Sequence, residues 1–219
     1  MMKFEDRIHA GRLLTNRLSS YQENNNTVVL ALPRGGIPIA YEIAKSLYLP
    51  FDVFLVRKLC VPGHEELAMG AITLDSQVFN TEVIKSFKID DESIQKAIVQ
   101  ERQELLRRNE KYRNNRLTPH FTGKTLILVD DGLATGATMR AAILSLKQQN
   151  PKKIVIAIPV APPEAKELFA NSVDELICLQ CPEDFHGVGY WYLSFPQLTD
   201  QEVGRYLLLA QQRQLLVET

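Results

Sequence analysis

Short apolar runs alternate with helical segments along most of this chain of 219 residues. The runs are rich in β-branched residues and predict buried strands at 27–32, 52–57, 124–130, 152–160 and 173–179. Helical spacing or composition predicts helices at 3–20, 37–49, 139–149, 164–171 and 200–216. Strands that are apolar throughout, rather than at every second residue, are typical of a parallel sheet covered by helices on both faces, and therefore of an α/β fold.

Residues 58–120 interrupt this alternation. The segment 58–70 is loop-like, 70–80 has the pattern of a hairpin, and 91–116 predicts one long helix. We therefore expect residues 1–219 to form a single elaborated domain, with 58–120 inserted between the second and third strands of the sheet.

Charge and cysteine content exclude several classes of protein. Lys and Arg number 25 against 26 Asp and Glu, and this balance argues against a general binder of nucleic acid or of anionic membranes. No apolar run approaches the ~20 residues of a membrane span. Three cysteines, Cys60, Cys178 and Cys181, are an odd number in a chain too large to need disulfides, which predicts a reduced, cytoplasmic setting.

The most specific motif runs from Leu126 to Thr138. An apolar strand ends in two adjacent carboxylates, Asp130 and Asp131, and a turn rich in glycine and threonine then opens a helix. Peptide N–H groups at a helix N-terminus bind anions, and two neighbouring carboxylates can accept hydrogen bonds from vicinal hydroxyls. A diol beside a phosphate describes ribose 5-phosphate. The alternative is an ordinary βα turn with capping threonines, but paired acids at a strand end are costly unless they are used.

Other nucleotide motifs are absent, since the turn has no lysine of a P-loop and no complete G-x-G-x-x-G follows a strand. In parallel sheets ligands bind at the carboxyl ends of strands. The strand exits at 33–36, 57–70 and 130–138 are therefore predicted to converge on one site.

The segment VDDGLATGAT resembles the phosphoribosyl-diphosphate (PRPP) loop of type I phosphoribosyltransferases. PRGG at 33–36 is similar to the pyrophosphate loop of that family, RKLCVPGHEELAMGA at 57–71 to its flexible catalytic loop, and 181–198 to the hood that covers its acceptor. The longer matches LPRGGIPIA and F-x-x-VG-x-WY resemble a bacterial group of such proteins whose acceptor is not established.

The resemblance implies a Mg²⁺-dependent displacement of pyrophosphate from C1 of PRPP by a base nitrogen, through a transition state that resembles an oxocarbenium ion. It implies that Asp130 and Asp131 hold the ribose hydroxyls and reach Mg²⁺ only through these or through water. It also implies a non-proline cis peptide in the 33–36 loop. The catalytic set implied is Arg34, Arg57, Lys58, Asp130 and Asp131. The remaining PRPP-binding residues implied are Gly35, Gly36, Gly132, Leu133, Ala134, Thr135, Gly136, Ala137 and Thr138.

Two departures bear on the acceptor. Enzymes for 6-oxopurines carry a further acid where this chain has Ala134, and a lysine where it has the turn 159–163, which argues against hypoxanthine and guanine as acceptors. LATGAT together with RKLCVPG is more similar to adenine enzymes of the family. Hood residues implied to stack on the acceptor are Phe185, Trp191 and Tyr192. The expected partners are small molecules and a second copy in a homodimer, rather than nucleic acid or a membrane.

Several weaker signals stay open. Cys178 and Cys181 form a C-x-x-C pair that favours packing over metal or redox chemistry, because no second pair exists. His64, Glu65 and Glu66 are solvated loop charges, or else Glu65 or Glu66 orients the acceptor or orders the waters of Mg²⁺. The basic excess at 101–116 is a solvated face or contacts a partner. Finally, the chain could sense PRPP without turnover or transfer phosphoribosyl to water.

Overall fold

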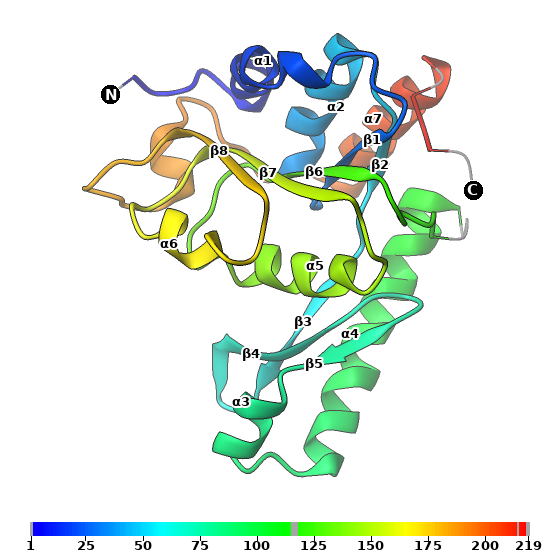
Figure 1. Cartoon of the computed structure of the whole chain (residues 1–219), viewed down its shortest axis with the longest axis vertical. Helices are drawn as coiled ribbons and strands as arrows, with labels where there is room; N and C mark the ends of the chain where they lie inside the picture. The colour runs from blue at the N-terminus through cyan, green and yellow to red at the C-terminus, as the bar shows by residue number, and fades with distance from the viewer. Residues whose placement is uncertain (1, 115–117, 214, 218–219) are drawn as a thin grey trace. The chain divides into compact units, whose positions relative to one another are not determined.

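The computed structural model describes residues 2–114, 118–213 and 215–217 (Figure 1). The chain divides into two compact units, each described here by itself. The sheet unit comprises Met1–Phe54, Phe121–Ala134 and Pro151–Glu218, and the hairpin unit comprises Leu55–His120 and Thr135–Asn150. The expectation of one domain over 1–219 stays a prediction.

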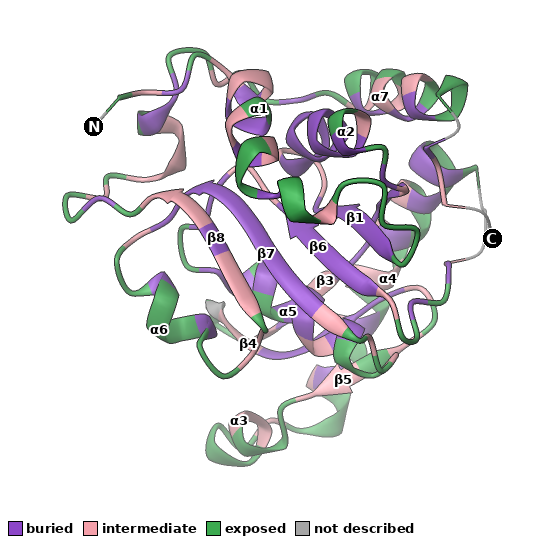
Figure 2. Cartoon of the chain, turned by 45° about the horizontal axis from the view of Figure 1, so that its top comes forward, coloured by how far each residue is buried: buried purple, intermediate pink, exposed green. Residues whose placement is uncertain are grey.

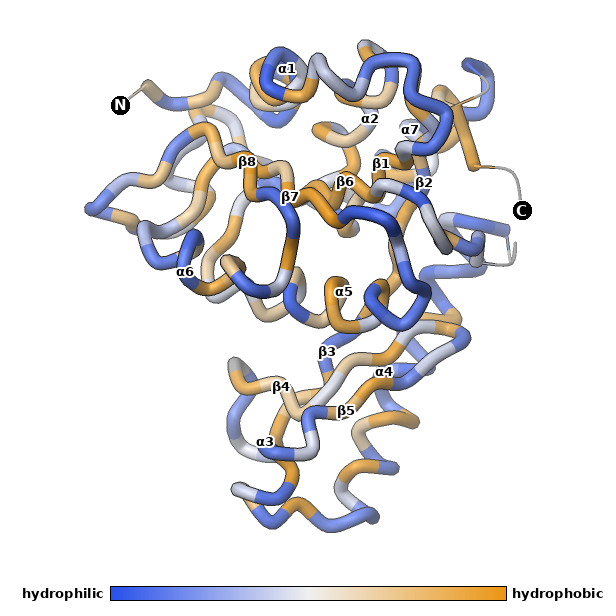
Figure 3. The backbone as a smooth tube through the Cα atoms, viewed as in Figure 1, coloured by the Kyte–Doolittle hydropathy of each residue, from blue (hydrophilic) through white to orange (hydrophobic). Residues whose placement is uncertain are grey.

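The sheet unit is built on a parallel sheet of order β2-β1-β6-β7-β8. Its strands are β1 (Thr27–Ala31), β2 (Phe51–Val53), β6 (Thr125–Val129), β7 (Lys153–Val160) and β8 (Glu175–Gln180). Every residue of β1, β2 and β6 is buried (Figure 2), and Figure 3 shows the hydrophobic colouring of β1 and β6. The predicted α/β class with a parallel sheet is confirmed. The predicted strand 52–57 is shorter, because β2 ends at Val53 and Arg57 begins a strand of the other unit.

Helices of the sheet unit cover both faces of its sheet (Figure 1). On one face lie α1 (Arg7–Arg17), α2 (Gly36–Leu47) and α7 (Asp200–Gln212), while the short α6 (Ala165–Phe169) lies on the other. The helix expected at 3–20 begins only at Arg7, because the Asp6 side chain accepts a hydrogen bond from the His9 N–H and caps it. A 3₁₀ turn, η1 (Ser19–Tyr21), follows it.

The order of the strands reverses at β1. From β1 the chain passes through α2 to β2 on one side, whereas β6, β7 and β8 follow on the other. Ala31 pairs with Val129 at the ends of β1 and β6, so the residues that follow both strands leave the sheet at the same level. Such a reversal opens a crevice outside the carboxyl ends of the two strands, where ligands of open α/β sheets bind.

The hairpin unit contains a three-stranded antiparallel sheet and three helices. Its elements are β3 (Arg57–Val61), β4 (His64–Ile72), β5 (Gln77–Phe79), α3 (Thr81–Ser86), α4 (Asp91–Arg113) and α5 (Ala137–Lys147). The hairpin expected at 70–80 is confirmed, since β4 pairs with β5.

The loop-like reading of 58–70 is wrong, because these residues form the hairpin of β3 and β4. Leu59 and Val61 of β3 are buried, so this strand buries every second residue, whereas β4 buries the consecutive residues 69–72. Register shifts on both sides of Cys60 break the pairing, and Pro62 and Gly63 close the turn. The period of two was obscured in the sequence by these irregularities and by the polar residues His64–Glu66.

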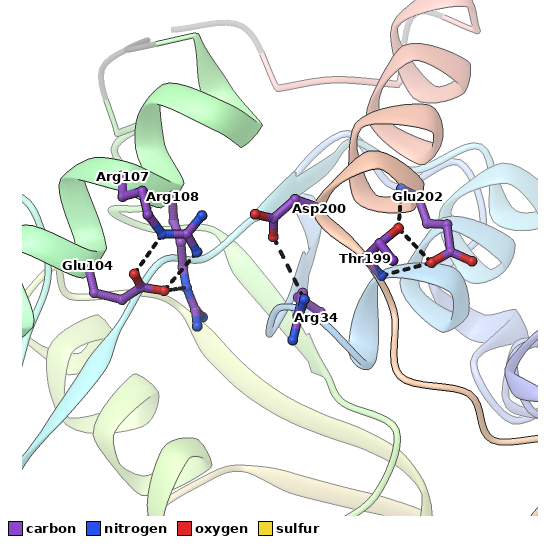
Figure 4. Close-up of polar contacts among 7 residues, drawn as sticks. All are labelled: Arg34, Glu104, Arg107, Arg108, Thr199, Asp200 and Glu202. Atoms are coloured by element: carbon purple, nitrogen blue, oxygen red, sulfur yellow. Dashed lines mark hydrogen bonds and ion pairs between the residues drawn. The ribbon is translucent and has the colours of Figure 1, made fainter.

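The helix expected at 91–116 is confirmed over Asp91–Arg113, while Arg116 lies outside the described residues. Glu104 pairs with Arg107 and Arg108 on its surface (Figure 4), the pattern of a solvated face. The last helix ends at Gln212 rather than 216, and Leu216 forms a bridge with Phe51. A search of the described residues finds no helix with the length and hydropathy of a membrane span.

Candidate active site

Two adjacent carboxylates follow β6 at the reversal point. The Asp131 N–H donates a 2.9 Å hydrogen bond to Oδ1 of Asp130, which closes a tight local turn. Burial raises the pKa of Asp130 well above its ordinary value of 3.8, and the charge of Asp131 raises it further. Burial also raises the pKa of Asp131, against the opposing effect of the Arg7 guanidinium. Two adjacent carboxyl groups whose pKa values are raised by burial are typical of a functional site.

The loop after β1 lies directly against this acid pair. The Leu32 N–H donates to the Val129 carbonyl at 2.9 Å, which extends the pairing of β1 and β6 by one residue. A Cβ added to Gly36 would lie 2.3 Å from the Val129 carbonyl oxygen, and one added to Gly35 would lie 2.0 Å from Oδ2 of Asp131. Only glycine allows this approach. The Pro33–Arg34 peptide is cis, as the resemblance implied.

Arg34 projects from the same loop toward the start of α7. Its Nη1 lies 3.9 Å from Oδ1 of Asp200, the first residue of that helix (Figure 4). Thr199 caps α7, since its hydroxyl accepts from the Glu202 N–H and the Glu202 carboxylate accepts from the Thr199 N–H. The position of Asp200 beside Arg34 is therefore set by the start of a well-capped helix.

Arg7 is a site residue that the sequence analysis missed. Its Nε and Nη2 donate to Oδ2 of Asp131 at 2.9 and 2.7 Å, across 124 positions of sequence. A weak signal was present: Arg7 shares the helical spacing of Ala10 and Leu14, both fully buried, so it lies on the inner face of α1. An arginine on a buried face needs an acceptor.

The hood contacts the acid pair through Tyr192. Its hydroxyl donates to the Asp131 carbonyl at 2.7 Å, and its ring lies 5.3 Å from that of Phe4 and 4.8 Å from that of Phe195. A Cβ on Gly132 would lie 2.7 Å from the Val188 side chain, so the hood also packs against the loop after β6. Tyr192 thus faces Asp131, and its predicted stacking on an acceptor stays a prediction.

The two other predicted acceptor residues lie elsewhere in the hood. Trp191 is 8% exposed and lines a hollow of about 510 Å³. The other residues that line it are Lys3, Cys181, Pro182, Glu183, Asp184 and Tyr190. Phe185 is half-buried. No side chain known to contact the acid pair lines this hollow.

The two cysteines of the C-x-x-C pair differ, since Cys178 is half-buried and Cys181 is exposed, and packing as the role of the pair stays a prediction. The Cys178 thiol donates to the Gln180 carbonyl at 3.1 Å, and burial raises the pKa of Cys178, which keeps it protonated at neutral pH. Among the residues that the structure describes, no group of three or more His, Cys, Asp or Glu could hold a metal ion.

The second half of the predicted PRPP loop belongs to the hairpin unit. Gly136 has a φ of 69° and caps α5, a conformation that favours glycine. Thr135 Oγ1 accepts from the Ala137 N–H at 3.4 Å, and both Thr135 and Thr138 are exposed. The N-terminus of this eleven-residue helix is therefore open, with threonine hydroxyls beside its N–H groups.

Arg57 and Lys58, predicted to neutralise pyrophosphate, begin β3. Arg57 Nε pairs with Oε2 of Glu101 on α4 at 2.5 Å, and Lys58 Nζ donates to the Glu65 carbonyl at 2.6 Å. The Cys60 thiol donates to the same carbonyl at 3.2 Å. The Glu65 carbonyl thus accepts two hydrogen bonds within the hairpin, while a role of the Glu65 carboxylate toward the acceptor or the waters of Mg²⁺ stays a prediction.

Comparison with known proteins identifies the family. The model of the phosphoribosyl transferase domain matches residues 5–193. The chain belongs to this phosphoribosyltransferase family. A Mycobacterium tuberculosis protein described as a putative phosphoribosyl transferase is 42% identical over 208 residues, which cover 94% of this chain and 47% of that protein. The chain thus spans about half the length of the curated relatives it matches.

Two solved structures have a fold similar to that of this chain. TT1426 from Thermus thermophilus superimposes with a TM-score of 0.86 and 40% identity, covering 95% of this chain and 99% of that one. AQ2163 from Aquifex aeolicus reaches a TM-score of 0.50 at 13% identity, covering 92% and 84%, which is a likeness of fold alone.

Proposed function

We propose that the chain is a phosphoribosyltransferase that uses PRPP and Mg²⁺, transfers the phosphoribosyl group to a nucleobase-like acceptor and releases pyrophosphate. One observation carries the proposal. Asp130 and Asp131 lie at the reversal of the sheet, packed against a glycine loop that leaves no room for a methyl group. This arrangement places two carboxylates, which can accept hydrogen bonds from hydroxyls, at the strand ends where ligands of open α/β sheets bind.

The reaction needs no protein nucleophile. The acceptor nitrogen forms a bond to C1 of PRPP and releases its proton to solvent, the bond from C1 to the pyrophosphate oxygen breaks, and pyrophosphate leaves with the bonding electrons. Asp130 and Asp131 bind the ribose hydroxyls, and the N–H groups of 132–138 bind the 5′-phosphate. Arg34 binds pyrophosphate, and Arg57 and Lys58 neutralise it as it leaves. Catalysis is then positioning together with electrostatic stabilisation.

The donor set fits Mg²⁺ bound indirectly. Carboxylate oxygens are hard ligands that suit this ion, which keeps several waters. Oδ2 of Asp131 is already occupied by Arg7, so Asp130 and the other oxygen of Asp131 would hold the ion through water or ribose hydroxyls. When bound, Mg²⁺ neutralises the charge of pyrophosphate.

The acceptor is proposed to be a base other than hypoxanthine or guanine. Ala134 is exposed and supplies no carboxylate, and the turn 159–163 supplies no lysine. Trp191 and Phe185 offer stacking surfaces in the hood. We also propose a cytoplasmic homodimer, whose state can be measured by light scattering.

The test is a pair of measurements on the full chain: PRPP binding by calorimetry, and pyrophosphate release from PRPP and Mg²⁺ with a panel of bases. Asp130→Asn with Asp131→Asn is expected to weaken PRPP binding at least about tenfold and to abolish release, since hydrogen bonds to charged groups are lost. The matched control is Asp75→Asn with Asp91→Asn, two exposed acids of the hairpin unit.

Unchanged PRPP binding in the Asp130 and Asp131 variant would contradict the site assignment. Tight PRPP binding by the unmodified chain without release for any base would favour a PRPP sensor. Release without any base would favour water as the acceptor.

A further inference from the structure

All three nitrogen atoms of the Arg7 guanidinium donate a hydrogen bond within the sheet unit. Nε and Nη2 donate to Oδ2 of Asp131, and Nη1 donates to the Pro196 carbonyl at 2.8 Å. The side chains of Arg7 and Asp131 are only 9% and 16% exposed. Arg7 therefore connects the first helix, the acid pair and the hood in one buried contact, whose strength comes from charge-assisted hydrogen bonds.

Aromatic contacts close this connection into a ring of interactions. The Arg7 guanidinium lies 3.9 Å from the centroid of Phe195, which in turn lies 4.8 Å from that of Tyr192. The Tyr192 hydroxyl donates to the carbonyl of Asp131, the residue whose carboxylate Arg7 contacts. A planar guanidinium can stack on a ring and donate in its own plane at once, and a lysine ammonium cannot.

The two oxygens of Asp131 consequently differ. Among the described residues, both hydrogen bonds to this carboxylate end on Oδ2, and none ends on Oδ1. The carboxylate cannot rotate without breaking both bonds to Arg7, so Oδ1 is held in one direction. A preorganised acceptor of this kind does not have to be ordered again when a ligand hydroxyl arrives.

We infer that Arg7 is a positioning residue for PRPP: it fixes Asp131 so that Oδ1 receives a ribose hydroxyl, and it sets the hood by the same contact. The inference rests on the proposed function. It gives the hood and the ribose site a common support, because Asp131, Pro196 and Phe195 all contact one side chain. Arg7 itself need not touch the substrate.

The experiment compares Arg7→Ala, Arg7→Met and Arg7→Lys with Arg12→Ala in the full chain. Arg12→Ala removes the same charge from the same helix, but the Arg12 side chain is 68% exposed. Calorimetry measures PRPP binding, and steady-state kinetics measure KM for PRPP and kcat. Trp191 is the only tryptophan and lies in the hood, so its quenching by acrylamide reports on hood packing. Urea unfolding shows whether each variant folds.

Arg7→Ala and Arg7→Met are expected to weaken PRPP binding about tenfold and to raise KM more than they lower kcat. Quenching of Trp191 should rise in both. Arg7→Lys should retain the charge and recover only part of the PRPP affinity, while Arg12→Ala should match the unmodified chain. If Arg7→Ala does not fold, the inference is tested by the tenfold loss expected for Arg7→Met and by the partial recovery expected for Arg7→Lys.

Two results would overturn the inference. One is a folded Arg7→Met with the PRPP affinity and Trp191 quenching of the unmodified chain. The other is a loss in Arg12→Ala equal to that in Arg7→Met, which would indicate a general effect of charge. Failure of the proposed function is distinct, because then the unmodified chain itself does not bind PRPP.

Discussion

The sheet unit and the hairpin unit hold their predicted site residues in different ways. In the sheet unit, Asp131 is enclosed by the backbone of Gly35, by Arg7 and by Tyr192. In the hairpin unit, Arg57 has one carboxylate partner, Glu101, and its side chain is 35% exposed. A packed site preorganises a binding group, whereas a partly exposed ion pair can exchange its partner for a substrate.

This difference in packing predicts different roles for the two sets of residues under the proposed function. Residues that must recognise the ground state of PRPP gain from being fixed before it binds. A cation that neutralises a leaving group acts only as charge develops, and a partly exposed ion pair costs less to break than a buried one. We therefore expect changes in the sheet unit to act on PRPP binding and changes at Arg57 to act on turnover.

The largest effect is expected from Gly35→Ala in the sheet unit. The new methyl group would lie 2.0 Å from Oδ2 of Asp131, so the loop or the acid must move. A displacement of about 1 Å in a catalytic site can cost about a hundredfold, and we expect at least this loss in PRPP affinity by calorimetry. The matched control is Gly204→Ala in α7, where nothing lies within 4 Å and helix propensity predicts a gain of about 0.5–1 kcal/mol in stability. Equal PRPP affinity in both variants would contradict the expectation that the packed loop of the sheet unit controls PRPP binding.

A smaller effect is expected from Arg57→Ala in the hairpin unit. We expect kcat for pyrophosphate release to fall about tenfold or more, with PRPP affinity nearly unchanged, because the charge acts on the leaving group. Arg107→Ala is the control, since Arg107 has its own partner in Glu104 on α4 (Figure 4). A rise in KM without a fall in kcat would place Arg57 among the binding residues instead.

The smallest effect concerns stability and pH. Because the pKa of Asp130 is raised in the folded chain, the native state holds its proton more tightly than the unfolded state. The free energy of unfolding therefore falls as pH rises above the ordinary value of 3.8. Asp130→Asn removes this loss, so its melting temperature should exceed that of the unmodified chain at pH 8 and approach it toward pH 4. A difference independent of pH would contradict the assignment.

Glu104 of the hairpin unit is expected to change the stability with pH in the opposite direction, because its pKa is lowered rather than raised. Hydrogen bonds from Arg107 and, to a smaller extent, from Arg108 together lower the pKa of Glu104 to about 2, against the burial that raises it. Its contribution to stability is present above the ordinary value of 4.5 and is lost as pH falls toward about 2. Glu104→Gln should thus be slightly less stable than the unmodified chain at pH 7, by about 0.5 kcal/mol for such exposed pairs, with no difference near pH 2.

Local sequence predicted the strands and the acid pair well. Four consecutive apolar residues at 126–129 of β6, followed by Asp130 and Asp131, predict a strand without knowledge of its partners, because a strand buried on both faces is apolar throughout. The hairpin of β3 and β4 could not be read in the same way. The alternation of buried and half-buried residues in β3 is accompanied by shifts of register on both sides of Cys60, so the sequence resembled a loop.

The sequence by itself determined the type of sheet, the position of the acids at its edge and the glycines that let a loop approach them. Only the tertiary structure decided that Arg7 holds Asp131 and that Tyr192 points to the same residue. The physical reason is the range of the interactions. Strand and turn preferences act between neighbours in sequence, whereas the partner of a buried charge is chosen by packing, here between residues 124 positions apart.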